Sequence, residues 1–499
     1  MKYIMALDQG TTSSRALIYD MEGRCIAVGQ HEFQQYFPSP GLVEHDPDEI
    51  WTSQFESAED ALRNGGLSWS DISAIGITNQ RETVIVWDRE TARPVYPAIV
   101  WQDRRTAARC EEIKRSGQEP LIRAKTGLLA DAYFSGTKIA WILDELDPGR
   151  SNSRSGQWCA GTVDSWLVYK LTGHSRHITD ATNSSRTMLY NLEMDSWDDE
   201  LMTLLDVPRQ ILPEIVDSIG IAAWTDPGIT GGVSIPISGI GGDQQAALFG
   251  QGCHDPGSAK NTYGTGCFFL MHTGSKIYRS NEGLLTTVAC REAGKCQYAL
   301  EGSVFIAGAA VQWLRDQMGL ISSAAETAPI ASALDSNGGV YFVPAFTGLG
   351  TPYWNMYARG TIVGLTRGTG SSHIVRAALE SIAYQNFDLV QAMENTTGIK
   401  LQELRVDGGA ASNDFLMQYQ ADMLQIPVKR TTEVEATARG AAWMAGIGAG
   451  LWTREQFIGN SADTFSPVMD PMGRDKLISG WQQAVRQTLA GSSRQKESA

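Results

Sequence analysis

The chain lacks the phosphate-binding loops of the common nucleotide-binding folds. It contains no Gly-x-x-x-x-Gly-Lys-Ser/Thr loop, and no Gly-x-Gly-x-x-Gly turn lies between a predicted strand and a predicted helix. The His-Arg-Asp and Asp-Phe-Gly motifs of protein kinases are missing as well. These absences disfavour a P-loop enzyme, a Rossmann dehydrogenase and a protein kinase.

Paired cysteines and long apolar runs are also missing. The seven cysteines are scattered and none forms a Cys-x-x-Cys pair, so we expect reduced thiols and neither disulfides nor a metal site. No apolar run approaches the ~20 residues of a membrane-spanning helix. Residues 3–7 have the pattern of a core strand and not that of a signal peptide. The sequence therefore predicts a cytoplasmic protein with no membrane span.

Positive charge is scarce relative to negative charge. The 41 Lys and Arg residues face 56 Asp and Glu residues, which gives a formal net charge of −15. This balance argues against nucleic acid or an anionic membrane as the main partner. It does not exclude a nucleotide, because Mg²⁺ and local N–H groups outweigh the overall field at a binding site. The 499 residues, 42% of them apolar, suit two or three domains with ordinary cores.

Two stretches of the chain show the same order of predicted elements, which is a meander of short strands followed by helices and further strands. In the first stretch we expect strands at residues 3–7, 16–19, 25–28, 72–78 and 83–87. In the second we expect them at residues 261–263, 267–271, 285–289, 298–300, 340–343 and 404–406. Helices are expected to begin near residues 46–49 and to span 304–318, 372–395, 414–424 and 438–449. This order predicts two similar α/β domains.

A segment rich in glycine and proline, residues 248–257, marks the expected boundary between the two domains. The sequence therefore predicts an N-terminal domain of residues 1–250 and a C-terminal domain of residues 251–499. The last residues, 491–499, are polar and are expected to be a frayed tail.

The hairpin predicted for residues 4–20 concentrates polar groups at its turn. An apolar run ends in Asp8, and Gly10, four hydroxyl residues and Arg15 follow before a second apolar run. Backbone N–H and hydroxyl donors in a tight turn suit a phosphate, and an acid at a strand end suits Mg²⁺. An ordinary hydroxyl-rich hairpin loop has the same composition, so this segment alone leaves both interpretations open.

Three further glycine-containing turns follow the hairpin along the chain, at Gly241–Gln244, Tyr263–Cys267 and Val406–Asn413. Asp-Gly-Gly between a strand and a helix lets a flat ring pack against the backbone, because no Cβ intervenes. Each turn alone is weak support for a nucleotide site. Their occurrence in this order, in both stretches, is strong support.

Taken together, these motifs resemble those of a known superfamily. Asp-Gln-Gly-Thr-Thr-Ser-Ser-Arg, Gly-Thr-Gly and Asp-Gly-Gly are similar to the turns of the actin, hexokinase and chaperone ATPases. Residues 133–141 and 364–368 resemble the two signatures of the FGGY carbohydrate kinases, and residues 78–83 and 101–106 those of the glycerol kinases among them. The resemblance covers nearly the whole chain. It implies an α/β fold of two actin-like (ribonuclease H-like) domains with a catalytic cleft between them.

The resemblance also implies that the chain phosphorylates glycerol to sn-glycerol 3-phosphate. A guanidinium beside a carboxylate supplies the donors and acceptors that a polyol needs, but adjacent strand residues reach one ligand only where the strand ends or bulges. An exposed ion pair at a strand end is the alternative. The residues that the family would use for the polyol are Arg81, Glu82, Tyr133, Asp243, Gln244, Trp101 and Phe268; without the resemblance, Trp101 and Phe268 would be expected in the core.

Asp243 is the candidate general base, since it need only accept the hydroxyl proton in phosphoryl transfer. A carboxylate capping the helix that begins near Gln244 is the alternative. By resemblance, Asp8 would hold Mg²⁺ and the cofactor would be ATP. The residues implied for the nucleotide and its phosphates are Thr11, Thr12, Ser13, Arg15, Thr265, Gly308, Gln312, Gly409 and Asn413.

One position departs from the regulated bacterial members of the family. They carry an arginine, after a Gly-Gly pair, in a loop that binds fructose 1,6-bisphosphate; here the corresponding residue after Gly231-Gly232 is Ser234. Serine cannot make the bidentate contact that arginine makes with phosphate. We therefore expect weak or absent inhibition by that sugar bisphosphate, and strong inhibition at micromolar effector would contradict this expectation.

Two other functions stay open on the sequence alone. One is an FGGY kinase for another polyol or a ketose such as a pentulose. The other is a non-catalytic nucleotide switch, for which a small-polyol pocket would be unnecessary. The resemblance implies a homodimer or homotetramer, which nothing in the composition tests.

Overall fold

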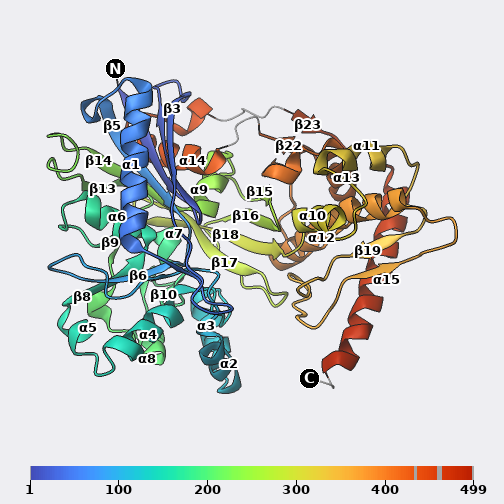
Figure 1. Cartoon of the computed structure of the whole chain (residues 1–499), viewed down its shortest axis with the longest axis horizontal. Helices are drawn as coiled ribbons and strands as arrows, with labels where there is room; N and C mark the ends of the chain where they lie inside the picture. Colours follow the sequence, from blue (N-terminus) through green and yellow to red (C-terminus); the bar gives the residue numbers. More distant parts are fainter. Residues whose placement is uncertain (1, 432–434, 458–462, 497–499) are drawn as a thin grey trace.

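The computed structural model describes residues 2–431, 435–457 and 463–496, and its main feature is one sheet that runs through both halves of the molecule (Figure 1). Thirteen strands are paired in the order β23-β22-β21-β15-β16-β18-β17-β13-β14-β5-β1-β2-β3. The two halves meet where β17 (Leu285–Glu292) lies beside β13 (Ile219–Trp224). Residues from both halves can therefore approach one another across this junction.

Each half of the sheet is built in the same way. In the first half the order is β3-β2-β1-β5-β14, with an antiparallel meander of β1–β3 and with β5 and β14 parallel to β1. In the second half the order is β18-β16-β15-β21-β22, with the same pattern of antiparallel and parallel pairs. The strands are β1 (Tyr3–Gln9), β2 (Ser13–Tyr19), β3 (Cys25–Glu32), β5 (Ile72–Asn79), β14 (Pro236–Gly242), β15 (Ser258–Tyr263), β16 (Cys267–Gly274), β18 (Lys295–Val304), β21 (Glu403–Asp407) and β22 (Val428–Arg430). The predicted repeat is confirmed.

The first half begins as the sequence pattern predicts. Helix α1 (Pro47–Gly65) packs on β2 and β3, and its N-cap Asp46 accepts a hydrogen bond from the backbone N of Asp48. Proline at the first helical position lacks the N–H that would otherwise need a partner there. Glu49, at the third helical position, accepts hydrogen bonds from the backbone N of Gln34 and from the hydroxyl of Tyr36. The helix start therefore has an acidic cap and a proline.

A second, four-stranded sheet is inserted in the first half, with strand order β4-β7-β6-β8. Most of the short helices of this half surround it (Figure 1). Its elements are β4 (Glu44–His45), β6 (Val84–Asp88), β7 (Ala98–Ile99), β8 (Trp158–Thr162), α2 (Ala107–Arg115), α3 (Glu119–Thr126), α4 (Ser135–Leu146), α5 (Ser151–Ser155), α6 (Val163–Leu171), α7 (Ala181–Ser184) and α8 (Asp199–Leu205). Because β6 follows β5 after a short turn, this insertion faces the end of β5.

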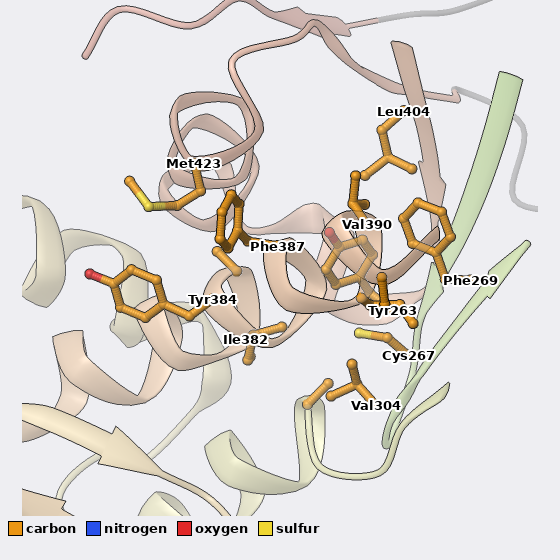
Figure 2. Close-up of a cluster of buried hydrophobic side chains, with 14 of the residues drawn as sticks. Tyr263, Cys267, Phe269, Val304, Ile382, Tyr384, Phe387, Val390, Leu404 and Met423 are labelled. Carbon is orange, nitrogen blue, oxygen red and sulfur yellow. The ribbon is translucent and has the colours of Figure 1, made fainter. Parts of the chain in front are cut away.

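The largest core cluster of the second half lies between its sheet and helix α12 (Ser371–Thr397) (Figure 2). Alternate residues of β16 divide between the two faces of the sheet, as the pleat requires. Phe269 belongs to this cluster, as do Tyr384 and Phe387 of α12, whereas Leu270 belongs to a smaller cluster with Leu248 of α9 (Asp243–Gly250) on the opposite face. Helix α9 thus lies on the face of the second sheet that is turned away from α12.

Helix α14 (Ala436–Gly448) belongs to the C-terminal part of the sequence but packs on the first half (Figure 1). It contacts β1, β5, β13, β14 and helix α9. The approach to α9 is close, because a Cβ on Gly440 would lie 1.8 Å from the carbonyl oxygen of Ala246. Glycine at this position lets the two helices touch through their backbones. The N-terminus of α14 is thereby brought to the hairpin of β1 and β2.

The predicted helix at residues 304–318 is wrong at its N-terminal end. Strand β18 continues to Val304, and α10 (Gly308–Asp316) begins only after a turn. The apolar residues 304–307 fit the interior of a strand end as well as that of a helix, since periodicity does not separate the two over four residues. The remaining strands and α-helices of this half are α11 (Thr327–Ser332), β19 (Tyr341–Val343), β20 (Thr361–Val363), α13 (Asp414–Leu424), β23 (Asp463–Phe465) and α15 (Pro471–Lys496).

The polar tail that we expected to be frayed from residue 491 instead continues α15 as far as Lys496. Residues 497–499 lie outside the described residues. The side chain of Trp481 in this helix is buried against α12, where its Nε1 donates to Asp388 at 2.7 Å. Packing of α15 on α12 at Trp481 anchors the helix, and polar composition alone did not reveal its length.

Asp388 is expected to make the stability of the protein depend on pH. Burial raises the pKa of its carboxyl to about 6 from 3.8, against the hydrogen bonds from Trp481 and Tyr353. Between about pH 4 and pH 6 the folded state therefore binds more protons than the unfolded state, so this carboxyl costs roughly 2–3 kcal/mol as pH rises. We expect Asp388→Asn to gain thermal stability relative to the wild type over that interval. Parallel melting-temperature profiles of the two proteins would contradict this expectation.

Among the described residues, no helix combines the length and the apolar character that crossing a membrane requires.

Candidate active site

The hydroxyl-rich turn of the first hairpin lies between β1 and β2, where the backbone N of Gly10 donates to the carbonyl of Ser13 at 2.9 Å. Thr12 is exposed, and Thr11 and Ser13 are half-buried. Gln80, which follows β5, donates through Nε2 to Gln9 Oε1 and to the carbonyl of Gly10, both at 3.0 Å. These bonds tie the hairpin turn to the end of β5, where the polyol residues were predicted.

Asp8 and Arg15 face each other across the hairpin as a paired position of β1 and β2. Burial raises the pKa of Asp8 to about 7, Arg15 lowers it, and the nearby carboxylates of Glu435 and Asp243 raise it further. Arg15 Nη1 also lies 2.6 Å from Oε2 of Glu435, at the N-terminus of α14. The turn therefore places the Asp8 carboxyl near two other carboxylates, and the guanidinium of Arg15 connects the turn to the N-terminus of α14.

A divalent cation would fit beside Asp8, because positive charge stabilises the ionised form of a desolvated carboxylate that lies near two other carboxylates, here Glu435 and Asp243. Within the described ranges, no group of three or more His, Cys, Asp or Glu side chains is arranged to hold a metal. Mg²⁺ is usually bound by one or two carboxylates, waters and substrate phosphates. The described residues therefore suit an ion whose other ligands are water and the phosphates of a nucleotide, and they do not form a site made of protein ligands alone.

Arg81 and Glu82 lie where β5 has ended and before β6 begins, in the strand-end position that the geometric argument required. Glu82 has a φ of 62°, in the left-handed region, and the backbone N of Thr83 donates to the carbonyl of Arg81 at 2.8 Å. This tight turn brings the two side chains to one side, with Arg81 Nε 3.8 Å from Glu82 Oε1. Both residues are buried, so the alternative of an exposed pair is wrong.

The guanidinium of Arg81 is oriented by several acceptors. Its Nη1 donates to Oε2 of Glu301 at 2.7 Å and to Oε1 of Gln245 at 3.2 Å, and its Nη2 donates to Oε1 of Glu301 at 3.2 Å. Nε lies 3.1 Å from Oδ1 of Asp243, yet makes no aligned hydrogen bond although it is buried. A buried donor without an acceptor is costly. Arg81 Nε is therefore suited to a ligand oxygen.

Two aromatic side chains connect this turn to the hairpin. The rings of Trp101 and Tyr133 meet edge to face with centroids 5.7 Å apart. Trp101 Nε1 donates to Oγ1 of Thr11 at 3.0 Å, which places the indole beside the hydroxyl-rich turn. Burial raises the pKa of the Tyr133 phenol, with Glu82 also raising it, so the hydroxyl stays protonated and can donate a hydrogen bond.

The second half contributes a group of side chains from one face of its sheet. Phe268 on β16 is paired with Thr262 on β15, and two residues along β16, on the same face, Leu270 lies opposite both Lys260 and Glu301. Directly opposed residues share a face, so Phe268, Lys260 and Glu301 lie on the same side. Lys260 Nζ donates to Oε1 of Gln244 and to Oγ1 of Thr262. The predicted Gln244 and Phe268 are thus brought toward the Arg81 turn by β15, β16 and β18.

Asp243 is the first residue of α9 and is partly exposed, with a side-chain exposure of 33%. Its Oδ1 accepts a hydrogen bond from the backbone N of the next residue, Gln244, at 2.7 Å, but the N-cap of α9 is Gly242 and no side chain caps this helix start, so the helix-capping alternative is wrong. The same oxygen faces Arg81 Nε, and its charge raises the pKa of Asp8. The carboxylate is therefore both a helix-terminal group and a member of the polar site. Partial exposure leaves room for a substrate hydroxyl.

A cavity of about 440 Å³ in the second half brings the more distant predicted residues together. It lies among the turns after β15 and β21 and helices α10 to α13, and its apolar lining includes Val311, Ile382 and Leu416. The five residues predicted for this part of the nucleotide all line it: Thr265, Gly308, Gln312, Gly409 and Asn413. An apolar cavity of this size with a few polar groups is typical of small-molecule sites.

The two glycines of this group have different physical explanations. A Cβ on Gly308 would lie 2.6 Å from the carbonyl oxygen of Gly264, so close backbone packing requires glycine there. Gly308 is also the first residue of α10 and not an interior one. A Cβ on Gly409 would meet no protein atom within 4 Å. Gly409 therefore leaves space for a ligand.

Four buried charged residues of the site were missed as individual candidates: Lys138, Arg186, Lys260 and Glu301. Lys138 Nζ donates to the backbone carbonyls of Glu82, Tyr133 and Phe134, and burial lowers its pKa to about 7. No spacing rule links these residues to the Arg81 turn. Charged residues within otherwise apolar strands, as at Lys260 and Glu301, are the one signal that could have singled out two of them.

Comparison with models of known protein families shows to which family the chain belongs. Residues 3–250 match the model of the FGGY family of carbohydrate kinases, N-terminal domain, and residues 259–449 match that of the C-terminal domain. The chain belongs to the FGGY family of carbohydrate kinases. The predicted mixed α/β fold of two domains is confirmed.

Curated FGGY proteins resemble the chain over its whole length. A glycerol kinase of Carboxydothermus hydrogenoformans is 56% identical over 97% of this chain and 97% of its own length. Glycerol kinase 2 of Thermotoga maritima is 54% identical over 99% of this chain and 100% of its own length.

Solved structures of FGGY kinases share the fold. The Plasmodium falciparum glycerol kinase with ADP has a TM-score of 0.93 and 36% identity, and the match covers 98% of each chain. A ligand-bound xylulose kinase from Lactobacillus acidophilus has a TM-score of 0.86, with 98% of this chain and 99% of that chain covered, at 22% identity. The second likeness concerns the fold alone.

Ser234 lies in the loop between β13 and β14 and is exposed, with its Oγ donating to the carbonyl of Thr225 at 2.9 Å. Its hydroxyl is thus held by the loop's own backbone. Weak or absent inhibition by fructose 1,6-bisphosphate stays a prediction for this FGGY kinase.

Proposed function

We propose that the chain transfers the γ-phosphoryl group of ATP to glycerol, producing sn-glycerol 3-phosphate and ADP. The observation that carries this proposal is the buried Arg81–Glu82 turn. There, an Nε donor of Arg81 without a hydrogen-bond partner lies 3.1 Å from the Asp243 carboxylate, and the half-buried Tyr133 interacts electrostatically with Arg81 and Glu82. Donors, acceptors and a carboxylate in so small a space suit a three-carbon polyol. The names of the full-length relatives support the same substrate.

In this mechanism the protein contributes mainly position and charge. Arg81 and Glu82 bind the polyol hydroxyls, Tyr133 donates a further hydrogen bond, and Trp101 and Phe268 cover the carbon skeleton. The Asp243 carboxylate accepts the proton of the attacking hydroxyl. The turn of Thr11, Thr12 and Ser13, together with Arg15, binds the phosphates. Mg²⁺, held by Asp8 when bound, would neutralise charge on the phosphates.

A kinase for another polyol or a pentulose is the second candidate. Structures of xylulose kinases share the fold at 22% identity or less, so the fold does not separate the two substrates. A coupled assay of ADP release with glycerol, dihydroxyacetone, erythritol and xylulose tests the choice. We expect glycerol to give the highest kcat/KM. A higher kcat/KM with xylulose would show that the substrate is a pentulose and not glycerol. ADP release that is independent of any polyol would contradict the kinase proposal.

The cavity that contains Gly409 is proposed to bind the adenosine part of ATP. We expect Gly409→Leu to raise the KM for ATP by about 10- to 100-fold, because the new side chain would fill part of the ligand space. The KM for glycerol and the melting temperature should stay close to wild type, since no protein atom lies within 4 Å of the position of the new Cβ.

Gly491→Leu is a matched control, because a Cβ there also meets no atom within 4 Å and α15 lies outside the cavity lining. An unchanged KM for ATP in Gly409→Leu, with normal folding, would place the nucleotide elsewhere.

The same proposal places the protein in the cytoplasm and in a homo-oligomer, either a dimer or a tetramer. The first expectation comes from the scattered cysteines and the lack of a signal-peptide pattern, and the second comes from the resemblance to the family. Light scattering after size-exclusion chromatography measures the assembly, and a monomeric mass would contradict the second expectation.

A further inference from the structure

Two residues of the proposed polyol site and two charged neighbours form a buried cluster, which we call the charge ring: Arg81, Glu82, Arg186 and Glu301. Arg81 donates to both carboxylate oxygens of Glu301, at 2.7 and 3.2 Å. Arg186 Nη2 donates to Glu301 Oε1 at 2.9 Å, and Arg186 Nε donates to Glu82 Oε1 at 2.7 Å. No side chain of the four is more than 2% exposed. Two guanidinium groups and two carboxylates thus alternate around the ring.

The ring joins the two halves of the molecule. Arg81, Glu82 and Arg186 belong to the first half, whereas Glu301 lies on β18 of the second half, 220 residues from Arg81. Glu301 projects from the sheet face that also carries Phe268 and Lys260, so the second half supplies the carboxylate only when its sheet is docked against the Arg81 turn. The orientation of Arg81 therefore depends on the assembly of both halves.

Glu301 is the central member of the ring. Although burial opposes it, Arg186 and Arg81 lower the pKa of Glu301 to about 2, so it stays ionised. Because Glu301 and Gln245 occupy both terminal nitrogens of Arg81, Nε is the nitrogen left to face Asp243 and a ligand. Arg186 likewise holds one oxygen of Glu82 and stacks over the rings of Tyr133 and Phe134 at 5.7 and 5.2 Å. Each polyol residue of the turn is thus held by Glu301 or Arg186.

We propose that Glu301 and Arg186 are positioning residues for the polyol. They orient Arg81, Glu82 and Tyr133 without themselves touching the reacting atoms. Buried charges carry a large desolvation penalty, which their attraction offsets only in good geometry. Removing one charge leaves its partners free to turn toward other acceptors, above all Asp243 for Arg81. This inference rests on the proposed polyol kinase activity, in which Glu301 and Arg186 were given no role.

The test is Glu301→Gln, which keeps the shape of the side chain but removes its charge. We expect the KM for glycerol to rise by about 10- to 100-fold, since each tenfold step corresponds to one weakened charged hydrogen bond. The KM for ATP should change by less than about threefold, because the cavity around Gly409 does not include the ring. The contrast between the two KM values is the readout that a merely structural role would not produce.

Glu380→Gln is the matched control. Glu380 is a buried glutamate on α12 that binds Arg376 at 2.7 Å and Asn337 at 2.9 Å, away from the charge ring. We expect this variant to fold and to keep the wild-type KM for glycerol, because burial raises the pKa of Glu380 and a neutral side chain is therefore tolerated there. If Glu301→Gln does not fold, Arg186→Lys replaces it, since lysine keeps the charge but cannot bridge Glu82 and Glu301 in the same geometry.

Failure of the positioning role and failure of the proposed kinase activity give different results. No glycerol-dependent turnover by the wild type would refute the activity, and the comparison would then use whichever polyol or ketose the wild type phosphorylates. A wild type that turns over glycerol, with an unchanged KM for glycerol in the folded variant, would overturn the positioning role. Equal increases in both KM values with a lowered melting temperature would overturn it as well.

Discussion

Replacing Asp243 by asparagine is expected to lower kcat by about 10²–10⁴-fold while leaving nucleotide binding intact. Asparagine keeps the size of the side chain and an oxygen acceptor for the backbone N of Gln244, but it cannot take up the proton of the attacking hydroxyl. The cavity that contains Gly409 does not include Asp243, so ATP binding should stay near wild type. Steady-state kinetics and calorimetric titration with a non-hydrolysable ATP analogue measure the two quantities.

Asp217→Asn is a close control for this variant. Oδ1 of Asp217 lies 3.2 Å from Nε of Arg291 and the side chain is 30% exposed, against 3.1 Å and 33% for Asp243 beside Arg81. The two carboxylates thus have similar surroundings, but Asp217 follows β12 (Glu214–Val216), away from the Arg81 turn. We expect Asp217→Asn to keep wild-type kcat. Near-normal turnover of Asp243→Asn would contradict the role of Asp243 as the general base.

Replacing Asp8 by asparagine is expected to lower kcat/KM by about 10²–10³-fold, the usual loss when one electrostatic stabiliser of the transition state is removed. The rate should also need a higher Mg²⁺ concentration for half-maximal activity. The stability change should have the opposite sign. Because burial raises the pKa of Asp8 to about 7, the ionised carboxylate destabilises the folded state above that pH, and neutral asparagine removes this cost. We therefore expect lower activity together with a higher melting temperature at about pH 8.

Asp20→Asn, at the other end of β2, provides the matched comparison. Although burial opposes it, hydrogen bonds from Arg24 and Glu22 lower the pKa of Asp20, so its ionised form is favoured in the folded state. This variant should lose stability and keep full activity. A fall in stability of Asp8→Asn, or an unchanged Mg²⁺ dependence, would contradict the proposed role of Asp8.

Several features of the site were predictable because they are local. Asp8 at the end of an apolar run, the hydroxyl residues after it and the glycine turns at residues 263–267 and 406–413 are short motifs with direct backbone consequences. The prediction that Arg81 and Glu82 must lie at a strand end also followed from the alternation of side chains along a strand. The structure has β5 ending at Asn79 and a left-handed Glu82.

Other features could not be predicted from local patterns. Residues 304–307 are apolar enough for a helix start, but the pairing of Val304 with Cys267 of β16 keeps Val304 in β18, and residues 305–307 form a turn before α10. The length of α15 was hidden by its polar composition, since the contact of Trp481 with Asp388 exists only in the folded chain. Helix α14 gave no sign in the sequence that it packs on the first half.

The sequence by itself determined the repeated α/β halves, the four polar turns and, through resemblance, the family and the proposed substrate. These depend on residue periodicity and short motifs, which act over a few residues of backbone. Only the tertiary structure decided that Glu301 of the second half neutralises Arg81 and Arg186 of the first. An ion pair between residues 220 positions apart has no local signature, because its energy depends on burial and distance in three dimensions.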